Sequence, residues 1–139
     1  MLHQALEIDP SNAQAHVALG TLWILTGQLD AGIERMRLGM KISPRDHRLG
    51  FWGWALGVFL LRAERSDEAL AEARTSSRRY PNFYFARVLE AAVLDRQEHL
   101  IKASASLALA SQLCTTLTLN EIILTHGHRV GKRMALLWK

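Results

Sequence analysis

The sequence lacks cysteine pairs, and this absence limits how the fold can be held together. Cys114 is the only cysteine among the 139 residues, so no internal disulfide can form. Its neighbours Leu113 and Leu117 are apolar, which favours a small buried side chain over a reactive thiol. A chain without disulfides is compatible with the cytoplasm, and we expect a cytoplasmic protein.

The sequence also lacks a long hydrophobic run. The most apolar stretch, residues 51–61, is bounded by Arg48 and Arg62. It is about half as long as the roughly 20 residues that cross a bilayer. Residues 1–4 lack the positively charged start and the apolar centre of a signal peptide. We therefore expect residues 51–61 to form a buried helix.

Motifs for catalysis, metal binding and cofactor binding are missing as well. His126 and His128 have the spacing of half a metal site, but no further ligands follow at a suitable distance. Residues 127–133 hold two glycines and several basic residues, yet their spacing differs from that of a phosphate-binding loop. Arg133 stands where Ser or Thr would bind magnesium. We expect neither a metal nor a cofactor, and we expect no enzymatic activity.

Basic residues outnumber acidic ones and give the chain a net charge of +4. Such a balance can attract acidic proteins, anionic lipid or nucleic acid. The basic residues are spread along the chain, however, and no nucleic-acid motif accompanies them. We interpret them mainly as solvated helix faces and expect neither nucleic acid nor a membrane as the partner. The local groups are Arg35, Arg37 and Lys41; Arg74, Arg78 and Arg79; and Arg129, Lys132 and Arg133.

Prolines are few and regularly placed. Pro10 and Pro44 lie 34 residues apart, and Pro81 follows 37 residues later. Each comes after a segment of helical character, and proline cannot continue a helix, so each marks a helix boundary. Ala and Leu dominate a chain that is 49% hydrophobic, which favours packed helices. The spacing predicts a repeat of about 34 residues with two helices per unit.

Three complete units can be aligned on this period, at residues 13–46, 50–83 and 84–113. The first carries, in order, Leu19, Gly20, Trp23, Gly27, Gly32, Met36, Gly39 and Pro44. The second follows an insertion of about three residues and carries Leu56, Gly57, Leu60, Ala69, Ala73, Ser76 and Pro81. The third carries Ala91, Leu94, Ala103, Leu107 and Ala110, with Thr115 in place of the proline.

These units resemble the tetratricopeptide repeat (TPR) family. The resemblance implies an all-α fold in which antiparallel helix pairs stack into a right-handed α-solenoid. It covers residues 1–113, including a partial unit at 1–12 whose first helix is missing. We therefore expect the chain to be a fragment of a longer protein, or its start codon to lie inside a longer gene.

Small residues recur at matching places in the helices of each unit. We expect Gly20, Gly57 and Ala91 in the first helices to let the paired helices approach closely. Ala69 and Ala103 are expected to do the same from the facing helix. One helix pair cannot bury its apolar side alone, so neighbouring pairs must stack.

Residues 114–139 do not continue the repeat. Thr118 and Glu121 have the spacing of a capping box, which predicts a short helix there. Gly127 and Gly131 are expected to interrupt the chain before a mixed basic and apolar segment. We interpret the tail as a helix that caps the last repeat. A basic amphipathic segment that binds a membrane surface or an acidic protein is the alternative.

The TPR resemblance implies a concave groove, lined by the first helices of successive units, in which a partner protein or peptide binds. Its residues would be Val17, Thr21, Phe51, Trp54, Val58, Leu61, Arg62, Phe85, Val88 and Arg96. An apolar, aromatic groove suits an amphipathic helix or an extended segment with large side chains. The alternative is that Phe51, Trp54 and Phe85 are core residues or are covered by the tail.

The expected function is therefore that of a protein–protein interaction scaffold. Self-association through the apolar end at residues 1–8 is a further expectation. Residues 43–46, 80–82 and 116–119 also resemble the repeat region that follows the catalytic domain in some bacterial adenylate or guanylate cyclases and in winged-helix regulators. This second resemblance implies a detached regulatory segment of a bacterial protein.

Overall fold

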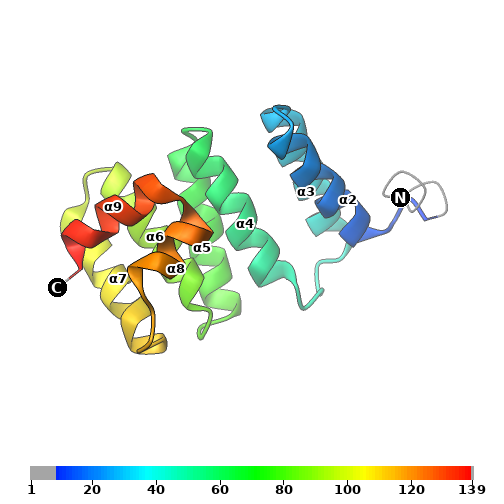
Figure 1. The fold of residues 1–139 in the computed structure, drawn as a ribbon. Helices are drawn as coiled ribbons and strands as arrows, with labels where there is room; N and C mark the ends of the chain where they lie inside the picture. Colours follow the sequence, from blue (N-terminus) through cyan, green and yellow to red (C-terminus); the bar gives the residue numbers. More distant parts are fainter. Residues whose placement is uncertain (1–8, 139) are drawn as a thin grey trace. The chain divides into compact units, whose positions relative to one another are not determined.

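The structure, a computed structural model, describes residues 9–138 apart from the side chain of Leu124. All regular secondary structure in this part of the chain is helical, which confirms the all-α prediction (Figure 1). The helices are α2 (Ala13–Leu25), α3 (Leu29–Ile42), α4 (Leu49–Arg62), α5 (Ser66–Arg79), α6 (Tyr84–Arg96), α7 (Leu100–Leu113), α8 (Leu119–His126) and α9 (His128–Leu137). Within residues 9–138, none of them is both long and apolar enough to span a bilayer.

The chain divides into two compact units, Met1–Trp52 and Gly53–Lys139, with α4 beginning in the first and continuing into the second. The self-association surface expected at residues 1–8 lies outside the described residues, as does most of the expected partial repeat.

In the first unit, α2 and α3 form a hairpin that is held at close range by two facing glycines. A Cβ atom built on Gly20 would lie 2.6 Å from the carbonyl oxygen of Gly32, and one built on Gly32 would lie 2.5 Å from that of Gly20. No side chain fits at either position without a backbone shift. Ile33 and Met36 of α3 are fully buried. The expectation that small residues allow this close approach is confirmed at Gly20.

The first helix of each expected unit ends in the same turn. Gly27, Glu64 and Glu98 have φ angles of 97°, 60° and 64° and lie at the same distance from the start of their units. The following N–H donates to the carbonyl five residues earlier: Gln28 to Trp23 (2.8 Å), Arg65 to Leu60 (2.9 Å) and His99 to Leu94 (2.8 Å). This Schellman geometry satisfies the last carbonyls of a helix. Its recurrence fits a helical repeat.

Replacing Glu98 with glycine is expected to stabilise the second unit. The left-handed conformation of Glu98 costs about 1 kcal/mol, whereas glycine adopts this conformation freely. Its exposed side chain makes no hydrogen bond or ion pair with the residues that the structure describes. We expect Glu98→Gly to raise the free energy of unfolding by up to ~1 kcal/mol in a urea titration. Glu98→Gln, which keeps the strain, is the control, and an equal gain from both would contradict the explanation.

In the second unit, α4 to α7 bury large side chains between small ones. Gly57 of α4 faces Leu89 of α6, since a Cβ built on Gly57 would lie 2.5 Å from Cδ2 of Leu89. The fully buried residues here include Leu56, Leu60, Ala69, Ala73, Val88, Leu89, Ala91, Val93, Ala103 and Ala110. Cys114 is only partly buried at the end of α7, so the prediction of a buried cysteine was wrong. A residue that ends a helix lies at the edge of the packed layer and keeps some contact with solvent.

The tail folds into two short helices, α8 and α9. The side-chain oxygen of Thr118 accepts from the N–H of Glu121 at 3.3 Å, which confirms the predicted start of α8. Gly127, with φ 95°, separates the two helices as expected. The prediction that Gly131 interrupts the chain was wrong, because Gly131 lies buried within α9. Any side chain there would collide with Ile123 of α8.

Candidate functional site

Most of the expected groove residues of the second unit are in its interior. Trp54, Val58, Leu61 and Val88 expose only 8%, 7%, 3% and 0% of their surface, and Phe85 is half-buried. Side chains this deeply buried cannot contact a partner while the tail is in place. The open part of the expected groove is therefore smaller than the sequence predicted.

The three expected groove residues of the first unit differ among themselves. Val17 is buried, and Thr21 is half-buried with its hydroxyl donating to the carbonyl oxygen of Val17 at 2.9 Å. Phe51 exposes 55% of its surface. Of the three, only Phe51 offers a large apolar surface to a partner.

The tail contacts the expected groove through an aromatic cluster formed by Trp54, Phe85 and His126. The rings of Trp54 and Phe85 are stacked with centroids 5.3 Å apart. The imidazole of His126, at the end of α8, lies edge-on to both, 5.3 Å from Trp54 and 5.7 Å from Phe85. The alternative interpretation, in which the tail covers Trp54 and Phe85, is thus confirmed for this cluster.

A hydrogen-bonded chain fixes the protonation state of His126. The indole N–H of Trp54 donates to Nε2 of His126 at 2.8 Å, and because tryptophan is only a donor, Nε2 must be unprotonated. Nδ1 then carries the proton and donates to the hydroxyl of Thr125, which donates in turn to the carbonyl oxygen of Glu121. Burial, with a smaller contribution from the nearby charge of Arg62, lowers the pKa of His126 to about 4. His126 is therefore neutral at physiological pH.

Helix α9 packs on the second unit as an amphipathic basic helix. Val130, Gly131 and Met134 are buried, whereas His128, Arg129, Lys132 and Arg133 are exposed. Arg133 donates two hydrogen bonds to the carboxylate of Asp95 on α6, at 2.7 and 2.8 Å, and this contact raises the pKa of Arg133. A bidentate pair of this kind fixes orientation as well as adding energy.

A cavity of about 220 Å³ remains open beside the tail. Four of the expected groove residues line it, namely Val58, Leu61, Arg62 and Arg96, together with the junction between α8 and α9. Arg96 donates to the carboxylate of Glu64 at 3.1 and 3.2 Å. The structure therefore does bring these four predicted residues together, around a pocket that is partly basic.

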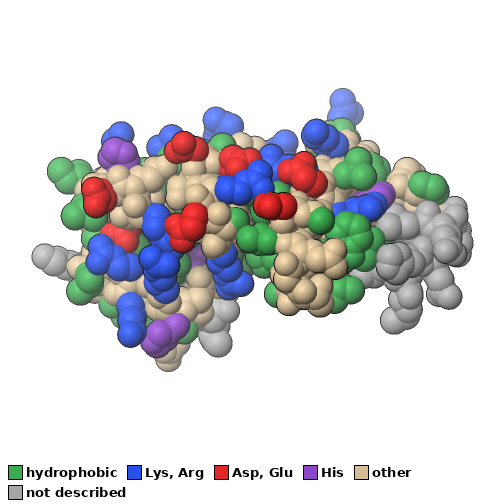
Figure 2. All heavy atoms as spheres, turned by 90° about the horizontal axis from the view of Figure 1, so that it is seen from above, with side chains coloured by type: hydrophobic (Ala, Val, Ile, Leu, Met, Phe, Trp, Pro, Cys, Tyr) green, Lys and Arg blue, Asp and Glu red, His purple; other side chains and the backbone are tan. Residues whose placement is uncertain are grey.

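Basic and acidic side chains are mixed on the face of the second unit seen at the left of Figure 2. The pairs Arg133–Asp95 and Arg96–Glu64 belong to this unit. A mixed surface agrees with the interpretation of the basic residues as solvated helix faces, since it forms no single basic stripe.

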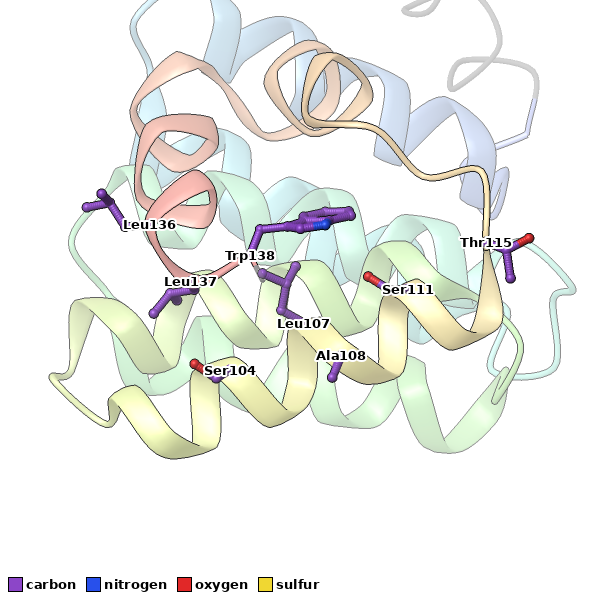
Figure 3. Close-up of a pocket in the computed structure, with 8 residues that line it drawn as sticks. All are labelled: Ser104, Leu107, Ala108, Ser111, Thr115, Leu136, Leu137 and Trp138. Carbon is purple, nitrogen blue, oxygen red and sulfur yellow. The ribbon is translucent and has the colours of Figure 1, made fainter.

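A second, larger hollow of about 630 Å³ lies between α7 and the end of α9 (Figure 3). Leu107, Leu136 and Trp138 line it, and Ile101 and Leu109 are exposed elsewhere on α7. This apolar surface was not predicted from the sequence. The signal for it was α7 itself, which carries one charged residue, Lys102, in 14 residues. A helix so poor in charge is usually buried on all sides.

No protein-family model matches the chain, and no curated protein is found as a relative. Among the residues that the structure describes, no three His, Cys, Asp or Glu side chains come together as metal ligands would. The candidate site is therefore defined by the geometry and the residue pattern of this chain alone.

Proposed function

We propose that this chain is a helical-repeat scaffold that binds an amphipathic helical segment of a partner protein and catalyses no reaction. The observation that carries the proposal is the position of α9, an amphipathic basic helix that packs against α6 and α7. The TPR resemblance, with its expected groove along the first helices, supports the same function. A cytoplasmic location is part of the proposal because the chain has no disulfide.

The contacts of α9 indicate the chemistry of the partner segment. Val130 and Met134 are four residues apart and are both buried, and Arg133 beside them binds Asp95. A partner helix would therefore present apolar side chains four residues apart and a basic side chain next to them. Anchors at this spacing are typical of helices that bind in grooves.

The partner segment must displace the tail from this surface. A tethered segment competes at a high effective concentration, so it lowers the apparent affinity of any segment that binds from solution. The tail would then occupy the binding surface in the absence of a partner and shield Trp54 and the apolar residues around it from water. This role accounts for the burial of residues that the TPR resemblance assigns to a binding groove.

An exchange experiment tests the proposal. A protease site inserted in the loop at residues 114–117 allows the folded protein to be nicked, and a labelled peptide of residues 117–139 is then added. We expect the peptide to replace the nicked tail, as measured by fluorescence anisotropy. An Arg133→Ala peptide should bind roughly fivefold to tenfold more weakly, because it loses two charge-assisted hydrogen bonds to Asp95 worth ~1 kcal/mol at this half-exposed site.

Two further peptides control the experiment. Lys132→Ala removes an exposed basic side chain from the same helix, and a loss equal to that of Arg133→Ala would contradict specific recognition by Asp95. A peptide of unrelated sequence that keeps apolar residues at positions 130 and 134 and a basic residue at 133 should also bind. Binding by the native sequence alone would show that the tail is a fixed structural cap and would overturn the proposal.

A further inference from the structure

We infer that the cavity where α4, α6 and the start of α9 meet binds a compact tetrahedral oxyanion, the group that inorganic phosphate and small phosphomonoesters share. The cavity has a volume of about 220 Å³. One molecule of liquid water takes ~30 Å³, so a phosphate group fits together with some water. Arg62 of α4, Arg96 of α6 and Arg129 of α9 all line the cavity. Three helices thus each contribute an arginine to the lining of one cavity.

The charges around this cavity are not balanced. Among the residues that the structure describes, Glu64 is the only carboxylate in the lining of this cavity, and it is bound by Arg96. Arg62 and Arg129 have no ion pair with the residues that the structure describes. Glu98 lines the adjoining cavity of about 210 Å³ and offsets part of this charge. Two guanidinium groups on different helices thus remain available to a single small anion.

Arg62 also lies close to the start of α9. A Cβ atom built on Gly127 would lie 3.8 Å from Nη2 of Arg62. Gly127 precedes α9 without a side chain that could cap it, and the first turn of α9 contains no acidic residue. The free N–H groups there add a partial positive charge beside the arginines. The inference rests on Arg62 and Arg129, and the partial charge of the helix end adds to the positive potential at the same place.

The lining of the cavity favours a tetrahedral oxyanion over a planar carboxylate. Val58, Leu61 and Leu89 form an apolar wall, and a low local dielectric strengthens the attraction between an arginine and an anion. A guanidinium group offers a planar fork of donors that matches two oxygens of a phosphate. Two guanidinium groups on different helices can each donate hydrogen bonds to one pair of oxygens of a tetrahedral anion. A planar carboxylate has only two oxygens to share.

Titration of the full chain with inorganic phosphate tests this inference. Chloride is used to hold the ionic strength constant, and the backbone amide signals of residues 128–130 are followed by NMR. We expect saturable shifts, and we expect Kd to rise at least fivefold in both Arg62→Gln and Arg129→Gln. Both side chains are exposed, so the fold should tolerate the changes, which a circular dichroism spectrum verifies. Glu64→Gln should bind phosphate more tightly, because it frees Arg96.

Lys132→Gln is the matched control, since Lys132 lies on α9, is exposed and does not line the cavity. Shifts that do not saturate, or an equal loss of affinity in Lys132→Gln, would reduce the effect to general attraction by a basic protein and overturn the inference. O-phosphoserine forms a second arm. Saturation by either probe supports the inference, and the tighter of the two identifies free phosphate or a phosphomonoester as the source. The peptide exchange depends on Asp95 and Arg133, so the two proposals can fail independently.

Discussion

Lowering the pH from 7.5 to 5 is expected to destabilise the second unit through His126. Burial lowers the pKa of this imidazole from 6.5 to about 4. In the unfolded chain it takes up a proton near pH 6.5, whereas in the folded unit it stays neutral until about pH 4. Between these values the unfolded state binds more protons, so the stability that is present above pH 6.5 falls as the pH falls.

The expected loss is large for a unit of this size. A difference of 2 to 3 pKa units corresponds to roughly 3 kcal/mol, of which about 2 kcal/mol is lost by pH 5. The physical cause is that a protonated Nε2 would face the indole N–H of Trp54, so that two donors meet in a buried site. The indole N–H signal of Trp54 in urea titrations at several pH values measures the effect.

Two glutamine variants separate His126 from the other groups that titrate. His126→Gln keeps an acceptor for Trp54 but cannot take up the proton, so its stability should change by about 2 kcal/mol less over this range than that of the native chain. His128→Gln alters an exposed histidine two residues away and should keep the native pH dependence. A native slope in His126→Gln would refute the assignment. In the nicked protein, the same protonation should speed the exchange of the tail.

Features that depend on local spacing could be predicted from the sequence. The prolines and small residues indicated where helices end and where they approach closely, as the glycine contact between α2 and α3 confirms. The spacing of Thr118 and Glu121 predicted the start of α8. A helix cap and a helix hairpin each involve residues that are near in sequence, so their residue types carry most of the information.

The site was predicted only in part, because its state depends on contacts between distant residues. Trp54 and Phe85 were identified as groove residues with the alternative that the tail covers them, and no local pattern could decide between the two. The deciding contact is the hydrogen bond from Trp54 to His126, which are 72 residues apart. His126 had been considered only as half of a metal site. Its contacts with the rings of Trp54 and Phe85 instead make it part of a buried aromatic cluster.

Glycine was the residue type most easily misread. A glycine in a sequence can mark a turn, as Gly127 does, or a close helix contact, as Gly131 does. The two uses are alike in the sequence, because both depend on the absence of a Cβ atom. Only the position of Ile123 against Gly131 distinguishes them.

Glycine-to-alanine substitutions at two matching repeat positions are expected to have unequal effects. In Gly20→Ala, the new Cβ would lie 2.6 Å from the carbonyl oxygen of Gly32 and 2.8 Å from the backbone nitrogen of Met36. Backbone atoms of a packed helix cannot move aside singly, so α2 and α3 must separate. Overpacking of this kind costs up to ~3 kcal/mol, against a gain of ~1 kcal/mol in helix propensity. We expect a net loss of about 2 kcal/mol in the stability of the first unit.

Gly57→Ala is the matched variant, at the same place in the second expected unit. Its Cβ would meet Cδ2 of Leu89 at 2.5 Å, but the nearest backbone atom, the carbonyl oxygen of Ala69, is 3.5 Å away. The end of a leucine side chain can rotate where a backbone cannot, so this change should alter stability by less than ~1 kcal/mol. Urea unfolding of both variants, followed by circular dichroism, measures the contrast. Equal losses would mean that the two helix pairs pack alike and that the glycine contact between α2 and α3 does not determine their separation.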